Sequence, residues 1–518
     1  MSSQNGQFSE TLAERFPPPE RFGWLKVWRR ESGISLALTF ALALTLIAVV
    51  VAFTLRWPQK PPGIPVVELT PITLSEDEVD AFEEPAPDVD GPQGPAGEGD
   101  PGGQPWHPRF PRREPTESTP EGGPRVGDAD PELLPPPGDP EAREEKAREF
   151  RKALDGVKKR IEKQRRDGGP VPSHIRNLFA DRSSAAGRKR ARKRDGGSPQ
   201  TEAAVQLGLK WLAAHQDRSG CWLLHDFRQP ECDCGHPGIQ SDTAATGLAL
   251  LPFLGNGQTH KKGRYRTVVQ AGLKWLVSDQ GPDGSFRSVQ GGRMYAHALA
   301  SIALCEAWAL THDKAIRESA QQAVNYILAA QHPGGGWRYT PRVSEDTSVI
   351  GWQMIALVSA RAGGLLGKTD AFDRAKNYLD RAQVDKTGAQ YAYTPRGGAR
   401  LTMTAEGLLC RQFLGWKHSE QGLQNGVKEL LRNPRHGGVN FYYWYYASQV
   451  LHHFGGKPWQ LWNEQLVPVL LELQSQDGHS RGSWAPGGGH DGAGGRIYAT
   501  ALALCNLEIY YRHRRIYR

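Results

Sequence analysis

Cysteine and histidine gather in one short stretch of this sequence, where they could bind a metal ion. Cys232, Cys234 and His236 lie within the segment ECDCGHPG. Thiolate and imidazole are suitable zinc donors, although cysteines at alternate positions differ from the usual pair separated by two residues. A disulfide from Cys221 to Cys232 or Cys234 is the alternative in an oxidising compartment, and free thiols are a third. The sequence therefore leaves zinc and disulfide chemistry both open.

A second set of residues with chemical potential lies near the starts of strongly apolar segments. This set mixes aromatic residues with threonine, one acid and one histidine: Tyr295, His297, Thr402, Glu406, Tyr443, Trp444 and Tyr498. Such a mixture suits a largely apolar ligand that a few polar groups hold in place. We therefore predict that these side chains bind a ligand at the mouth of the fold that brings them together.

Tandem repeats are the elements that would position both sets. Three copies align well: GLKWLAAHQDRSGCW at 208–222, GLKWLVSDQGPDGSF at 272–286 and AVNYILAAQHPGGGW at 323–337. Each copy reads as an amphipathic helix that ends in glutamine, followed by a loop with glycine and an aromatic residue. Weaker copies begin at 375, 426 and 466. Similarity at such a period is typical of stacked helical pairs.

A much more apolar helix follows each of these loops. The six segments are 243–254, 296–310, 348–360, 402–414, 444–454 and 498–511. A helix that is apolar all round must be buried all round, whereas an amphipathic helix keeps one side in water. The pattern predicts an all-α fold, an (α/α)6 toroid over residues 199–518. An open solenoid would expose each inner helix on one side and would need polar capping repeats.

The repeats also carry a family resemblance. An aromatic–aliphatic pair, three residues, glutamine, a short glycine loop and tryptophan resemble the QW repeat of squalene-hopene cyclases. The ring of six pairs resembles the β subunits of protein prenyltransferases. The resemblance covers about residues 200–511 and is closest to membrane-anchored bacterial prenyltransferase and squalene oxidase repeat proteins, whose activity is generally unassigned. It implies that the glutamines and tryptophans have a structural role, tying one helix end to the next.

The resemblance also points to positions for catalytic acids, but the motifs are incomplete. Squalene-hopene cyclases protonate an alkene with the middle aspartate of a DxDDT segment, which must be a strong acid in a dry site. Segment 239–243 (IQSDT) keeps Asp242 but has serine at the donor position. Segment 343–347 (VSEDT) places Glu345 there, followed by Asp346. These three acids are the implied catalytic candidates, and the alternative is that both aspartates cap helices.

The metal site of the prenyltransferases has no counterpart in the matching positions. Segments 438–444 and 496–500 contain neither cysteine nor histidine. We therefore expect a toroid that binds a hydrophobic ligand, a peptide or an envelope partner without conventional terpene cyclisation. The alternative is an isoprenoid-modifying enzyme, similar to a terpene cyclase or a prenyltransferase, that uses acids at the mouth of the toroid. An isoprenoid, a lipid or a peptide would suit the predicted lining, and zinc is the one cofactor that the residues suggest.

The residues before the repeats predict a membrane anchor. Residues 34–55 form an uncharged apolar run, which at about 1.5 Å per residue is long enough to cross a hydrocarbon core of about 30 Å. Basic residues precede this run and the chain turns acidic after it, so the positive-inside rule predicts that residues 1–33 are cytoplasmic. The prediction is a single-pass protein of the cell membrane whose C-terminal domain is extracytoplasmic.

Three segments connect this anchor to the repeats. Residues 56–140 are rich in proline, glycine and acidic residues, which predicts a disordered linker. Apolar residues at spacings of three and four predict a charged amphipathic helix over 141–166, which docks on the domain or dimerises. Residues 167–198, with the run RKRARKR, are predicted to be a solvated basic linker. Much of the net charge of +8 lies here, so nucleic acid is not expected as a partner.

Overall fold

The computed structural model describes most of the C-terminal part of the chain. The described residues all belong to the second of two compact units, Pro71–Arg518, and comprise 140–167, 171–227, 232–288, 290, 292–434, 438–488 and 490–517. The helix predicted at 34–55 lies outside these residues, as does nearly all of the linker predicted at 56–140. Among the helices of the described residues, none has both the length and the apolar character needed to cross a bilayer.

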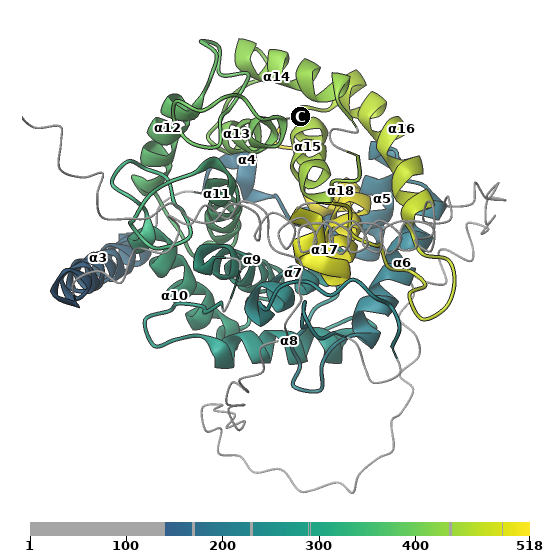
Figure 1. Ribbon diagram of the computed structural model, residues 1–518, viewed down its shortest axis with the longest axis horizontal. Coiled ribbons are helices and arrows are strands. Elements are labelled where there is room, and N and C mark those ends of the chain that lie inside the picture. The colour runs from purple at the N-terminus through teal and green to yellow at the C-terminus, as the bar shows by residue number, and fades with distance from the viewer. Residues whose placement is uncertain are drawn as a thin grey trace, which may run out of the picture. The chain divides into compact units, whose positions relative to one another are not determined.

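Helices alternate between an outer and an inner layer in the repeat region (Figure 1). The outer helices are α6 (Pro199–Ala214), α8 (Arg266–Asp279), α10 (Lys314–Ala330), α12 (Ala371–Ala382), α14 (Gln421–Arg432) and α16 (Gly456–Leu473). The inner helices are α7 (Asp242–Gly255), α9 (Arg293–Thr311), α11 (Thr347–Ala362), α13 (Leu401–Phe413), α15 (Phe441–Phe454) and α17 (His490–Leu507). The prediction of an all-helical fold built from paired helices is confirmed for these residues.

The inner helices contact one another in a closed cycle. Each packs on the next along the chain, and α17 packs on α7. In the outer layer α16 likewise meets α6 (Figure 1). The described repeats therefore close into a toroid.

The two layers differ in how much of each helix is buried. In α11 all residues from Thr347 to Ala360 are buried, and complete burial of one large apolar side chain stabilises the fold by about 1.5–3 kcal/mol. In α12 the buried positions form one stripe with spacings of three and four, for example Phe372, Ala375 and Tyr378–Leu379. The inner helices thus need neighbours on every side, whereas the outer helices can face water.

Glutamine side chains fasten successive pairs to one another. Nε2 of Gln331 donates to the carbonyl oxygen of Gly335 in its own loop, at 2.7 Å, and to that of Ala371 in α12, at 2.9 Å. Gly335 has a φ of 105°, and a Cβ there would collide with the carbonyl oxygen of Arg374. Three other glutamines make the same pair of bonds, namely Gln216, Gln280 and Gln474. The repeat glutamine therefore has the structural role that the family resemblance implies.

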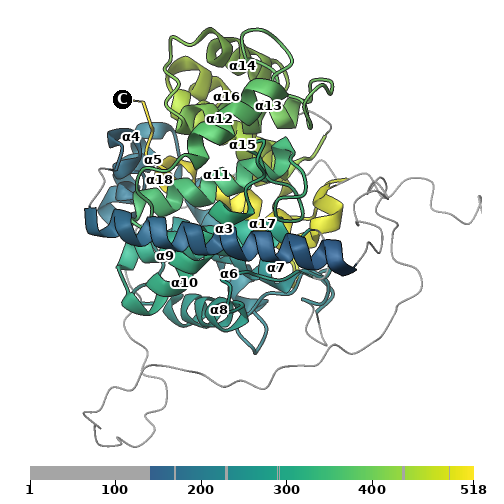
Figure 2. The same ribbon diagram turned by 90° about the vertical axis from the view of Figure 1, so that its left-hand side faces the viewer.

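The described part of the segment predicted to be a basic linker, residue 167 and residues 171–198, is folded instead. It forms α4 (Ser173–Arg176), the 3-10 helix η2 (Ala180–Ser183) and α5 (Ala185–Asp195), which gather with α18 (Ile509–Arg512) at one end of the inner helices (Figure 2). Arg182 is wholly buried, and its guanidinium lies 2.7 Å from the carboxylate of Glu306. Arg512 lies 3.3 Å from the same carboxylate. The prediction was wrong because the acidic partner of the basic segment is on a distant helix.

Helix α3 (Pro140–Asp167) lies on the outside of the ring against α10 (Figure 2). Its residues Leu154, Val157 and Ile161 are buried, and the ring of Phe150 meets that of Tyr326 edge-on at 5.0 Å. The helix thus occupies the range in which an amphipathic helix was expected, and it docks on the repeats.

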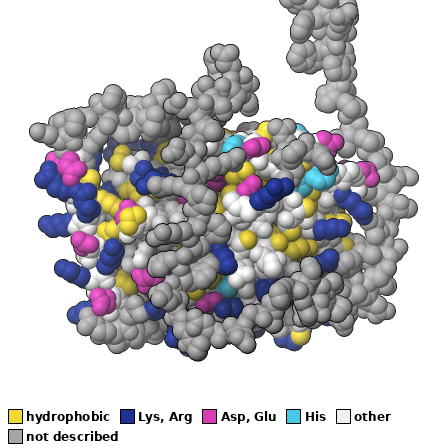
Figure 3. Space-filling view, turned by 90° about the horizontal axis from the view of Figure 1, so that it is seen from below, with side chains coloured by type: hydrophobic (Ala, Val, Ile, Leu, Met, Phe, Trp, Pro, Cys, Tyr) yellow, Lys and Arg dark blue, Asp and Glu magenta, His cyan; other side chains and the backbone are white. Residues whose placement is uncertain are grey.

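Basic side chains of the described residues are dispersed on the side of the molecule that Figure 3 shows. On the side shown in Figure 3, lysines and arginines lie beside acidic and hydrophobic side chains and do not form one continuous patch. On this side, the positive charge of the chain is therefore spread among groups of other kinds.

Candidate functional site

Acidic and tyrosine side chains meet at the end of the toroid where the inner helices begin. We call this group the acid–tyrosine cluster, and its members are Tyr295, Asp346, Glu406, Tyr442, Tyr446 and Tyr498. Each of the other members lies close enough to Glu406 or Asp346 for the negative charge of an ionised carboxyl group to raise its pKa. Three of the tyrosines, at 295, 442 and 498, are partly exposed. The cluster thus extends from solvent to fully buried acids.

Glu406 is a buried acid whose carboxyl oxygens have no hydrogen-bond partner among the described residues. Gly351 faces it closely, since a Cβ at Gly351 would lie 2.6 Å from Oε2 of Glu406. The hydroxyl of Tyr442 is close enough to the carboxyl group to lower its pKa as a hydrogen-bond donor would, but the hydrogen bond that its geometry supports is the one to the carbonyl oxygen of Ser348, at 3.3 Å. Burial raises the pKa of Glu406 well above its ordinary value. The neutral form is therefore favoured, and it can donate one hydrogen bond.

Asp346 has a structural role as well as a place in the cluster. Its Oδ1 accepts hydrogen bonds from the backbone N–H of Val349 at 2.8 Å and from the hydroxyl of Ser348 at 2.9 Å. Asp346 is therefore the N-cap of α11, which confirms the capping alternative for this residue. Its Oδ2 accepts the hydroxyl of Tyr393 at 3.2 Å. Burial nevertheless raises the pKa of Asp346 to about 6.

The other two acid candidates lie outside the cluster. Glu345 is held by Arg381, at 2.6 Å, and by His332, at 3.3 Å, on the loop before α11. Asp242 is the first residue of α7 and lies 3.5 Å from His225. It does not cap that helix, because Ser241 occupies the N-cap position. Glu345 is thus engaged in structural ion pairs and does not face the cluster as the resemblance implied.

Of the seven predicted ligand-binding residues, the structure brings three together, namely Tyr295, Glu406 and Tyr498. Thr402 is half-buried in the first turn of α13. His297 is wholly buried and structural, because its Nδ1 accepts the backbone N–H of Phe286 at 3.2 Å and its Nε2 bonds the carbonyl oxygen of Ala323 at 3.0 Å. Burial lowers the pKa of His297 to about 4, which keeps it neutral. The structure therefore does not bring His297 into the acid–tyrosine cluster.

Tyr443 and Trp444 face the outer layer and lie outside the acid–tyrosine cluster. The hydroxyl of Tyr443 donates to the carbonyl oxygen of Asn433 at 3.0 Å, and Nε1 of Trp444 donates to that of Pro434 at 2.9 Å. Neighbouring residues of a helix point about 100° apart. The residue before Tyr443, Tyr442, therefore faces the cluster, and so does Tyr446, which lies four residues after Tyr442. Sequence reasoning missed Tyr442 and Tyr446, although their spacing of four was a usable signal.

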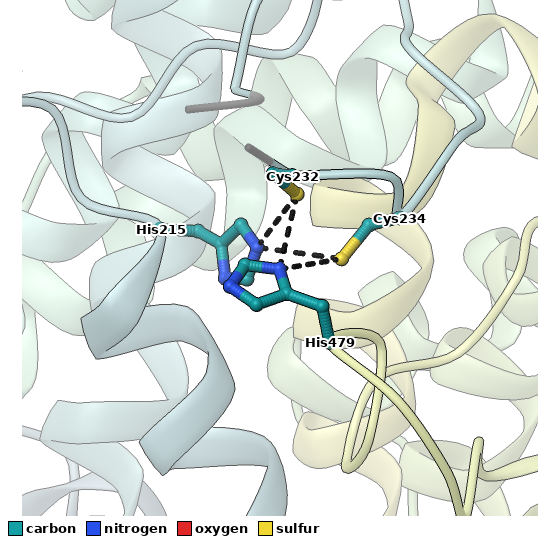
Figure 4. A group of neighbouring side chains, drawn as sticks. All are labelled: His215, Cys232, Cys234 and His479. Atoms are coloured by element: carbon teal, nitrogen blue, oxygen red, sulfur yellow. Dashed lines mark hydrogen bonds between the residues drawn. The ribbon is translucent and has the colours of Figure 1, made fainter. Parts of the chain in front are cut away.

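Two cysteines and two histidines form a candidate metal centre (Figure 4). The ligand atoms of His215, Cys232, Cys234 and His479 lie within 4.8 Å of one another. Sulfur-to-nitrogen distances run from 3.2 Å, between Cys232 and His479, to 3.5 Å, between Cys234 and His215. Ordinary zinc bond lengths place tetrahedral sulfur and nitrogen donors about 3.5 Å apart. The spacing therefore fits a four-coordinate ion.

The surroundings of His215 orient it for this role. Its Nδ1 is 2.7 Å from the carbonyl oxygen of Trp211, and its ring stacks on the indole of Trp211 at 3.9 Å. A proton on Nδ1 would satisfy that oxygen and leave the lone pair of Nε2 directed at the two sulfur atoms.

Of the three predicted metal ligands, the two cysteines belong to this group and His236 does not. All six cysteines are free, so the disulfide from Cys221, which the sequence left open as the alternative to metal binding, is not formed. His479 was missed because it lies between α16 and α17, far from the cysteines in the sequence. His215 was missed although it lies on the same connection as the cysteines, between α6 and α7. The only sequence signal for His215 was its place directly before a repeat glutamine, where the next two copies have Asp279 and Ala330.

Comparison with known proteins yields structural neighbours alone. No family model and no curated protein matches the chain. The type II terpene cyclase MstE from Scytonema is 14% identical, over 61% of this chain and 98% of that one, with a TM-score of 0.42. A variant of MstE in complex with its product, merosterolic acid A, is 13% identical, over 60% of this chain and 96% of that one, with a TM-score of 0.44. A structure described as a novel alpha-amylase from Clostridium perfringens is 10% identical, over 60% of this chain and 97% of that one, with a TM-score of 0.43.

The raised pKa of Asp346 predicts that the stability of the fold depends on pH. Burial raises its pKa from 3.8 to about 6, so between these values the folded protein holds a proton that the unfolded chain has released. The resulting contribution to stability is present below pH 4 and is lost as the pH rises through 6. The free energy of unfolding of the wild type minus that of Asp346→Asn should therefore fall by about 2–3 kcal/mol from pH 4 to pH 7. Urea titrations at each pH measure it, and a constant difference would contradict the raised pKa.

Proposed function

We propose that the toroid binds a mainly apolar ligand with an uncharged hydrogen-bonding group at the acid–tyrosine cluster. The observation that supports this most directly is Glu406, a buried carboxyl group without a hydrogen-bond partner among the described residues. Buried polar groups without a partner are uncommon in folded proteins, and a bound water, an ion or a catalytic role are among their explanations. A ligand hydroxyl or carbonyl group could accept the proton of Glu406.

The neighbouring side chains support a neutral, apolar ligand. The rings of Trp352 and Tyr446 lie 5.4 Å apart, and those of Tyr442 and Tyr446 lie 5.2 Å apart, so aromatic surface adjoins the acid. No member of the cluster is basic, and the nearby guanidinium of Arg338 is 3.3 Å from Asp346. A diphosphate needs cationic partners. An isoprenoid alcohol or a similar lipid therefore suits the cluster better than a prenyl diphosphate.

Binding of farnesol to the full chain in detergent, followed by tryptophan fluorescence, tests this proposal. Glu406→Gln keeps the size, neutrality and donor capacity of the side chain and should retain binding within about threefold. Glu406→Leu removes the donor and should weaken binding by about 10- to 100-fold, as expected for a lost hydrogen bond of about 1–3 kcal/mol. The hydrocarbon farnesene should bind the wild type and Glu406→Leu alike. The exposed Glu420→Gln is the matched control.

Equal affinity of the wild type for farnesol and farnesene would contradict the proposed role of Glu406. Circular dichroism of each variant establishes that the fold is retained. This check separates loss of the hydrogen bond from loss of the toroid.

A second candidate function is proton donation to the bound ligand. Two neighbouring acids, Glu406 and Asp346, have raised pKa values because of burial, and a neutral carboxylic acid is what protonation of an alkene or a carbonyl requires. Formation of a rearranged product from farnesol or squalene by the wild type, together with its loss in Glu406→Gln, would identify Glu406 as the donor. Binding without any product would leave the first proposal alone.

We also propose that the metal centre holds Zn²⁺. Two thiolates and two imidazoles are a usual donor set for structural zinc, and their spacing here suits a tetrahedral ion. Elemental analysis of the full chain, purified without chelator, should find about one zinc ion per chain. The double variant Cys232→Ser, Cys234→Ser should contain none, whereas Cys410→Ser, in the buried part of α13, should keep it. Wild-type protein without metal, even after incubation with zinc, would contradict this proposal.

We further propose that residues 34–55 anchor the protein in the cell membrane with the N-terminus in the cytoplasm. The uncharged apolar run and the basic residues before it support this. The full chain should stay in the membrane pellet after washing with alkaline carbonate, and deletion of 34–55 should move it to the supernatant. Release of the intact chain by the wash would show that this segment does not span the bilayer.

A further inference from the structure

The four donors of the metal centre come from the two ends of the repeat array. His215, Cys232 and Cys234 belong to the first helical pair, α6–α7, whereas His479 lies in the last pair, between α16 and α17. We call the junction of these two pairs the seam. Every other pair of neighbours in the ring is joined directly by the chain. At the seam the described residues are joined by noncovalent contacts alone, because all cysteines are free.

Backbone hydrogen bonds cross the seam beside the metal centre. The N–H of Arg496 donates to the carbonyl oxygen of His236 at 2.9 Å, and the N–H of Ile239 donates to that of Ala493 at 2.8 Å. These bonds place the loop that carries both cysteines against the start of α17. The metal centre is thus part of a contact between loops from opposite ends of the array.

Glycines allow these two loops to approach closely. A Cβ on Gly238 would lie 2.5 Å from the carbonyl oxygen of Gly494, and Gly495, with a φ of 71°, would place a Cβ 2.6 Å from the backbone nitrogen of Gly238. The helical geometry of α17 is interrupted at Gly495. Because α17 continues from there to Tyr498, the seam also supports one side of the acid–tyrosine cluster.

The seam has the same pair of glutamine hydrogen bonds, which we call the glutamine clamp, as the junctions at Gln216, Gln280 and Gln331. Gln474 donates to Gly482 in its own loop and to Ala204 in α6, both at 2.9 Å, as Gln331 does between pairs that the chain connects. The clamp therefore does not distinguish this junction. What the seam has in addition is a set of four metal donors divided between its two sides.

We infer that the metal centre is a clasp that closes the ring by bonding the first repeat to the last. This inference rests on the proposed binding of zinc. An ion held by donors from both sides stabilises only the closed arrangement that presents all of them. His479 is the single donor from the last repeat, and it is exposed, so the clasp can be opened at one side chain.

Hydrogen exchange of the full chain, with saturating zinc and after chelation, tests the clasp. Removal of zinc should raise exchange by about tenfold or more at 232–240 and 474–484, because local opening at the seam becomes easier. The loop at 331–346, which lies between pairs joined by the chain, should be unchanged. Equal exchange at the seam with and without zinc would overturn the inference, even if zinc binds.

The variant His479→Ala separates zinc binding from ring closure. It leaves three donors on the first repeat, so at saturating zinc it should still contain the ion, while its seam should exchange like that of the metal-free wild type. Full protection of the seam in zinc-loaded His479→Ala would overturn the clasp and leave the zinc site in place. His418→Ala, which changes an exposed histidine outside the seam, should behave like the wild type. Absence of zinc from the wild type would instead contradict the proposed metal.

Discussion

Burial of the inner helices on every side is the constraint from which the rest of this structure follows. Neighbouring inner helices and the outer layer cover their sides, which forces the array to close. At the opposite end, α18 packs on α15 and α17, α4 packs on α11, and α5 packs on α18. At their N-terminal ends polar groups remain, and three tyrosines of the acid–tyrosine cluster reach solvent there. The candidate site is thus located at the end of the toroid where its polar groups meet water.

Two buried glutamates show how differently the two ends are built. Burial alone would raise the pKa of Glu306, but Arg182 and Arg512 hold it well below the ordinary range, so this carboxylate is charged. Glu406 has no such cation, and burial raises its pKa well above the ordinary value. A buried ion pair gains little net stability, but removal of one partner is costly, so such pairs fix the position of the elements that carry them. An unpaired neutral acid is free to bind something else.

The sequence was informative wherever a pattern had one physical cause. The repeats and their apolar partners predicted the paired helices, and capping could be named as the alternative role of Asp346 because that interaction is local. Contacts between distant elements could not be read in the same way. Nothing near Arg182 reveals that it neutralises Glu306, and nothing near Cys232 identifies His479. At α15 the residue types were right, but helical phase decides which tyrosines face the cluster, and the exact start of a helix is poorly determined by sequence.

Closure also fixes the number of repeats. An open superhelix can gain or lose a helical pair at little cost, since each unit touches its neighbours alone. In this ring, loss of one pair would force the remaining units to turn more sharply, and it would draw the cysteines away from the histidine that completes their group. Each clamp, such as the bond from Gln474 to Ala204, would then have to form at a new angle. The geometry of the closed ring therefore holds the number of helical pairs constant. Changes in length are tolerated in the loops and in the residues before the repeats.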